Sequence, residues 1–120
     1  LDTTLARRRA QADRYASGLA GTVLDLPREV GPVRHAWRNY VIECDDRDSL
    51  RARLAEAGIA TNTPYAPPMH LQPVHAELGQ GPGSFPVAER SCARLLGLPL
   101  GPHLELDQID EVAEAVRAAL

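Results

Sequence analysis

The side chains best suited to contact a small molecule gather in one proline-rich stretch, residues 65–86. Tyr65, His70, Gln72 and His75 lie within it, and phenol, imidazole and amide groups all form directional hydrogen bonds. Prolines at 67, 68, 73 and 82 stiffen the stretch, and a stiff loop makes a good wall for a binding site. We therefore expect the candidate site here.

The spacing of residues does not support a metal site or a catalytic nucleophile. His70 and His75 do not have the i, i+4 separation of a helical metal pair, and neither His35 nor His103 completes a recognised spacing. We predict no metal site. No nucleophile elbow surrounds Ser84, which instead fits a helix cap. Glu89 and Arg90, which follow the stretch, fit a solvated charge pair on a helix.

Composition excludes several classes of protein. The chain has 120 residues, a net charge of −3 and 44% apolar residues, which suits one domain and argues against nucleic-acid binding. No apolar run is long enough to cross a membrane. Cys44 and Cys92 are far apart, and without a signal peptide we expect reduced thiols and a cytoplasmic location. Because no methionine precedes Leu1, we also expect a fragment rather than a complete gene product.

The periodicity of apolar residues predicts alternating helices and strands. Helices are expected at residues 5–19, 47–57 and 86–96, at a short segment from Pro73, and after a cap at Asp107. Strands are expected at 35–44, 59–63 and 98–100. The order indicates an α/β (α+β) sandwich with a three-stranded mixed sheet.

Alternation along the strand expected at 35–44 places Trp37 and Val41 on the face opposite Tyr40. We expect the Trp37 face to point away from the helices. An exposed apolar patch, or self-association through it, follows from this expectation.

Several segments, in this order, resemble the C-terminal part of the DegT/StrS family of sugar aminotransferases, which are fold-type I enzymes that use pyridoxal phosphate (PLP). The matching segments are an opening helix with Arg9, Ala12, Tyr15 and Leu19, then residues 35–42, 47–50, 54–61, 65–72, 85–90 and 98–100, and the closing helix after Asp107. The loop at 65–72 is the most characteristic, because it carries the tyrosine–proline–histidine pattern of that family.

The resemblance implies that residues 1–120 are the small C-terminal domain and that the large PLP-binding domain is absent. In such enzymes a lysine of the large domain holds PLP, but all 13 basic residues of this chain are arginine. We therefore expect no catalytic or cofactor-binding residue here, and no PLP bound to this chain alone. The implied substrate contact is His70, followed by Tyr65 and Gln72, whereas His35 and Tyr40 match family positions but are interpreted as structural.

The resemblance further implies a whole enzyme that transfers an amino group from glutamate or glutamine to a keto-sugar nucleotide. It would act as a cytoplasmic homodimer in a sugar or secondary-metabolite pathway. This chain alone is expected to be inactive. Two alternatives remain open from the sequence: a stand-alone module that binds a nucleotide sugar or a protein, and one chain of a split aminotransferase whose PLP domain is a separate polypeptide.

Overall fold

Residues 2–120, which the computed structural model describes, form four α-helices, two strands and two short 3₁₀-helices. Along the chain these are α1 (Asp2–Gly18), β1 (Tyr40–Glu43), α2 (Arg47–Glu56), η1 (Met69–Leu71), η2 (Pro73–Leu78), α3 (Pro86–Arg94), β2 (Leu95–Leu98) and α4 (Leu106–Ala119). The helices predicted at 5–19, 47–57 and 86–96 and near the end of the chain are confirmed within a few residues, and the short segment from Pro73 is a 3₁₀-helix. The predicted cap at Asp107 is wrong: Glu105 caps α4, through a capping box with Gln108.

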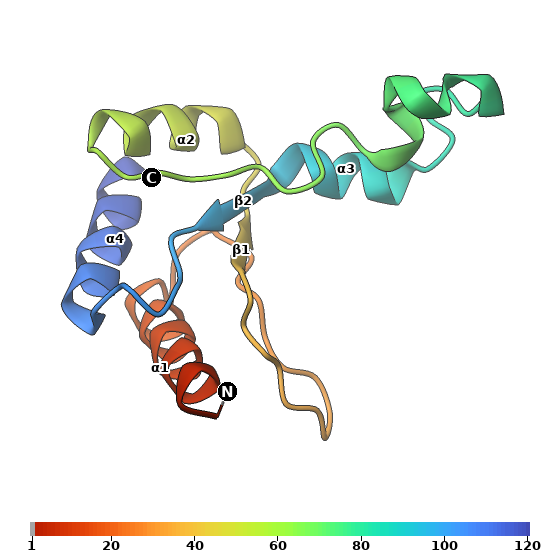
Figure 1. Ribbon diagram of the computed structural model, residues 1–120. Helices are drawn as coiled ribbons and strands as arrows, with labels where there is room; N and C mark the ends of the chain where they lie inside the picture. The colour runs from red at the N-terminus through yellow and green to blue at the C-terminus, as the bar shows by residue number, and fades with distance from the viewer. Residues whose placement is uncertain (1) are drawn as a thin grey trace.

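One hydrophobic core lies between α1, α2, α4 and the two strands (Figure 1). In α4, Ile109, Ala113 and Val116 are buried at the spacing that the 3.6-residue period requires. Leu50 and Leu54 of α2 are buried in the same core. This arrangement makes the helices at the two ends of the chain neighbours in space.

Polar bonds tie α1 to the segment that leads into α4. Gln11 is fully buried, and its amide nitrogen donates to the carbonyls of Gly101 at 2.8 Å and Leu104 at 2.7 Å. The hydroxyl of Tyr15 donates to the carbonyl of Pro99 at 2.7 Å. A buried polar group needs such partners, because an unpaired one would cost about 1–3 kcal/mol.

The sheet has two antiparallel strands, so the predicted three-stranded mixed sheet is wrong. Tyr40 pairs with Leu98 and Glu43 with Leu95. The strand expected at 59–63 is reduced to one bridge, in which Asn62 exchanges two hydrogen bonds with Gly97. Pro64, which has no N–H to donate, follows immediately. For the same reason Pro99 ends β2 at Leu98, upstream of the edge strand expected at 98–100.

The prediction that Trp37 lies on an exposed strand face is also wrong, because the strand begins only at Tyr40. Trp37 has a φ of 46°, a left-handed value that interrupts the alternation of a strand. Its indole is 6% exposed and packs on Tyr40 with ring centroids 5.8 Å apart. Val41 is half-buried. The predicted apolar patch is therefore absent from this position among the described residues.

Exposed apolar side chains gather instead on an arm, which we define as residues 63–94 and which includes η1, η2 and α3. Figure 1 shows the arm extending away from the helices that surround the core. No residue of the arm is buried as a whole. Its exposed large apolar side chains are Tyr65, Met69, Val74, Leu78, Phe85 and Val87. The arm thus presents apolar surface without having a core of its own.

We predict that Gly18→Ala destabilises the fold, because a Cβ at this position would lie 2.9 Å from the Cβ of Ala113 in α4. Overpacking of this kind costs about 1–3 kcal/mol. Gly81→Ala is the matched control, since a Cβ there meets nothing within 4 Å. Urea denaturation should show a clear loss for Gly18→Ala and almost none for Gly81→Ala. Equal stability of the two variants would contradict the close approach of α1 and α4.

A second prediction concerns acid stability, through an ion pair between α1 and the loop before β1. Two Arg9 nitrogens contact the two Glu29 oxygens at 2.8 Å each. The hydrogen bonds from Arg9, followed by the one from the His35 backbone amide, lower the pKa of Glu29 from 4.5 to about 2. A lowered folded-state pKa stabilises the fold above the unfolded pKa, and this contribution is lost as pH falls through the folded value.

Glu29→Gln should therefore be less stable than the parent at neutral pH, and the difference should shrink between pH 4.5 and about 2. Denaturation at several pH values measures this difference. Glu56→Gln is the control, because Glu56 is exposed and forms no ion pair within residues 2–120. A stability difference that does not change with pH would contradict the prediction.

Candidate functional site

The arm carries an open apolar groove of about 530 Å³. Tyr65, Met69 and His70 form part of one wall, and Ala88, Ser91 and Cys92 of α3 form part of the other. A second hollow of about 390 Å³ adjoins it, lined by His70, Gln72 and Pro73 among others. His70 lines both. The three predicted contact residues, Tyr65, His70 and Gln72, thus lie around two adjoining hollows, with His70 common to both.

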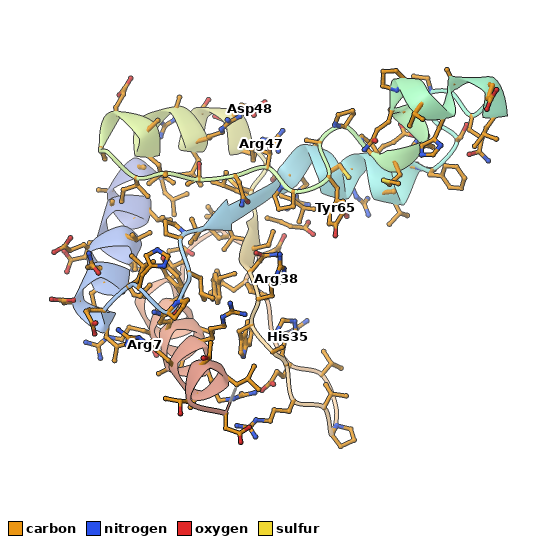
Figure 2. The ribbon with its side chains drawn as sticks, in the orientation of Figure 1. Arg7, His35, Arg38, Arg47, Asp48 and Tyr65 are labelled. Atoms are coloured by element: carbon orange, nitrogen blue, oxygen red, sulfur yellow. The ribbon has the colours of Figure 1, made fainter. Side chains whose placement is uncertain are left out.

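Tyr65 stands at the base of the arm beside α3 (Figure 2). Its φ is 56°, a left-handed value that is uncommon for an aromatic residue. The residue is 71% exposed, so its hydroxyl is available to a ligand or to another protein surface. Strained backbone of this kind persists where the surroundings hold it, and it is common at binding sites.

His70 is held by Glu89 of α3. The Nε2 atom of His70 lies 3.0 Å from a carboxylate oxygen of Glu89. The imidazole also meets the ring of Phe85 edge-on, with centroids 4.9 Å apart. As a result, only 7% of the His70 side chain is exposed, although it belongs to the arm. The predicted contact residue is therefore fixed in orientation before any ligand arrives.

Glu89 also organises the turn before α3. Its carboxylate accepts hydrogen bonds from the backbone amides of Gly83 at 2.9 Å and Phe85 at 3.1 Å. These two backbone bonds, and then the bond with His70, lower the pKa of Glu89. The position in the first turn of α3 favours a negative charge as well. Glu89 is therefore an ionised acceptor at neutral pH.

Two interpretations of this region were wrong. Ser84 makes no side-chain cap for α3, whose N-terminal residue is flanked by Phe85 with no side-chain capping bond. Glu89 supplies the acceptor for the free amides instead, so it is more than a solvated partner of Arg90. The sequence offered one signal, a glutamate in the first turn of a helix after a glycine-rich turn.

The other residues named from the sequence lie outside the His70–Glu89 pair. The side-chain nitrogen of Gln72 donates to the sulfur of Met69 at 3.6 Å. His75, on η2, lines the larger groove. His35 lies on the segment before β1, away from the arm, where its Nδ1 accepts from the Trp37 amide (Figure 2). Tyr40 is fully buried, and burial raises its pKa to about 12. Tyr40 thus lies in the core as expected, whereas His35 lies outside the strand in which it was expected.

The described residues 2–120 contain no group of three His, Cys, Asp or Glu side chains that could hold a metal ion. No helix within this range is long and apolar enough to cross a membrane. The residues that line the groove include no arginine, and most of them are apolar. The groove suits a largely apolar surface with a few hydrogen-bonding groups.

These observations define a small α/β domain with an open apolar groove and one oriented imidazole–carboxylate pair. The sequence profile of the DegT/DnrJ/EryC1/StrS aminotransferase family matches residues 1–117, so the chain belongs to this family. The match runs through both the core and the arm.

Individual relatives agree with this assignment. The erythromycin biosynthesis sensory transduction protein EryC1 of Saccharopolyspora erythraea is 40% identical over 98% of the chain. The dTDP-3-amino-3,4,6-trideoxy-alpha-D-glucose transaminase of Streptomyces venezuelae is 41% identical, also over 98%. The chain spans about a third of the length of each relative, 32% and 31% respectively.

Solved structures show the same fold. The chain is similar to S. venezuelae DesV in complex with a ketimine intermediate, with a TM-score of 0.92, 41% identity, and coverage of 98% of this chain and 32% of that one. It is also similar to a putative sugar aminotransferase of Streptococcus pneumoniae in its PMP form, with a TM-score of 0.90 and 27% identity. That match covers 98% of this chain and 31% of the other.

We predict that Glu89→Ala loosens the arm and leaves the core intact. Removing the carboxylate leaves the amides of Gly83 and Phe85 and the Nε2 of His70 without their acceptor. Hydrogen exchange at these amides should accelerate, whereas exchange in α1 and α4 should not change. Glu77→Ala, at an exposed position of η2, is the control. Uniform acceleration over the whole chain would instead show that Glu89 supports the core.

Proposed function

We propose that this chain is the C-terminal small domain of a PLP-dependent aminotransferase that transfers an amino group from glutamate or glutamine to a keto-sugar nucleotide. The observation that carries the proposal is the family match over residues 1–117, together with the span of about a third of each relative. The printed activities of relatives, such as that of the dTDP-amino-sugar transaminase, support the substrate class.

The residues present do not fit PLP by themselves. The chain contains no lysine, so no side-chain amine is available to hold the cofactor, and arginine is not a nucleophile at neutral pH. The groove wall also lacks arginine to meet the cofactor phosphate. We therefore assign the cofactor to the remainder of the enzyme and derive no reaction step within this chain.

The role we propose for this chain is to form one wall of the pocket that holds the substrate. Tyr65 offers an exposed hydroxyl, and His70 and Gln72 offer ring and amide groups in the adjoining hollow. The apolar arm would pack against the PLP-binding part, or against a second subunit of a cytoplasmic homodimer. Such packing would cover Met69, Leu78 and Phe85, whose exposure is otherwise unexplained.

The proposal predicts that the isolated chain binds no PLP and transfers no amino group. After incubation with PLP and dialysis, the protein should show no cofactor absorbance, because no lysine amine is present to retain it. Mixing with a lysine-bearing PLP domain of the same family should produce a stable complex.

The control is that PLP domain alone, which should retain the cofactor under the same dialysis. Cofactor absorbance retained by the isolated chain would contradict the proposal. A chain that binds a nucleotide sugar tightly by itself, with no effect of the PLP domain, would instead support the stand-alone module.

A further inference from the structure

The pair formed by Glu89 and His70 constrains the chemistry of the imidazole as well as its position. An ionised carboxylate only accepts hydrogen bonds, so the atom of His70 that faces Glu89 must carry a proton. That atom is Nε2. When the imidazole is neutral, its other nitrogen, Nδ1, must then hold a free lone pair.

Glu89 is well suited to keep this arrangement. The amide of Gly83 donates to both carboxylate oxygens at 2.9 Å, and the amide of Phe85 donates to one at 3.1 Å. These bonds fix the plane of the carboxylate independently of His70. The ring of Phe85 restricts the imidazole from another side. The Glu89 carboxylate is therefore an acceptor in a fixed position, and this position decides which nitrogen of the His70 ring carries the proton.

Nδ1 of His70 is free to meet a ligand. Within residues 2–120 it has no hydrogen-bond partner, and His70 lines both hollows of the arm. Glu89, in contrast, lines neither hollow. The carboxylate therefore acts on a bound molecule through the residues that it holds, His70 and Phe85, both of which line the larger groove.

We propose that Glu89 is a positioning residue that fixes His70 in the Nε2-protonated tautomer, so that Nδ1 accepts a hydrogen bond from a hydroxyl or N–H group of the sugar substrate. This inference rests on the proposed function for the identity of the ligand. The assignment of Glu89 and of the tautomer rests on the geometry of the arm alone.

The tautomer can be measured directly by NMR in the chain labelled with ¹⁵N-histidine, over a series of rising pH that is continued until the His70 signals no longer change. We expect the His70 signals of a single tautomer, with Nε2 fully protonated and Nδ1 fully unprotonated. Glu89→Ala should shift both nitrogens toward the averaged values of two exchanging tautomers. Glu77→Ala should leave them unchanged.

Two substitutions of His70 separate ligand contact from simple support of the arm. His70→Gln can keep a donor toward Glu89 but removes the acceptor at the Nδ1 position. In the full-length aminotransferase it should retain the protection of the Gly83 and Phe85 amides and lower kcat/KM for the keto-sugar nucleotide about fivefold, the effect of one neutral hydrogen bond. His70→Ala should lower both the protection and kcat/KM.

The outcomes are distinguishable. If the His70 signals are the same in the parent and in Glu89→Ala, or if Nδ1 carries the proton, the positioning role is overturned. If His70→Gln retains full kcat/KM, the pair only supports the arm, and the ligand contact is overturned. A full-length protein without aminotransferase activity would contradict the proposed function, yet it would leave the tautomer measurement valid.

Discussion

The contact between the helices at the two ends of the chain is the constraint on which the rest of the structure depends. Gln11 of α1 is fully buried, and it bonds the backbone on either side of the turn before α4. Gly18 lies so close to Ala113 that no side chain fits between them. Because α1 and α4 both supply residues to the core, their contact brings the two ends of the chain together, and the residues between them connect these two helices.

The arm is one of the segments that connect α1 and α4, and hydrogen bonds rather than buried apolar side chains hold it together. Residues 63–94 contribute no fully buried residue, so the hydrophobic effect alone cannot hold them in place. One carboxylate, that of Glu89, instead joins the turn at Gly83 to His70. The chain thus combines a hydrophobic core with a groove-bearing arm whose apolar surface is exposed.

Local sequence signals predicted the elements that depend on local physics. The helices expected at 5–19 and 47–57 end at Gly18 and Glu56, close to their expected ends, because the periodicity of apolar residues acts within a few residues. The third strand and the exposed face of Trp37 failed for the opposite reason. Pairing at Asn62 depends on Gly97, which is far along the chain, and the left-handed backbone at Trp37 interrupts an alternation that the apolar pattern predicted to continue.

The sequence by itself determined the helices, the family and the stretch that carries the candidate site. It also determined that no lysine is present to hold PLP. Only the tertiary structure decided that Glu89, 19 residues from His70, would bind its Nε2. A glutamate that is a solvated surface charge and a glutamate that is an oriented hydrogen-bond acceptor look the same in a sequence. What distinguishes them is the set of amides and rings that folding brings around the carboxylate.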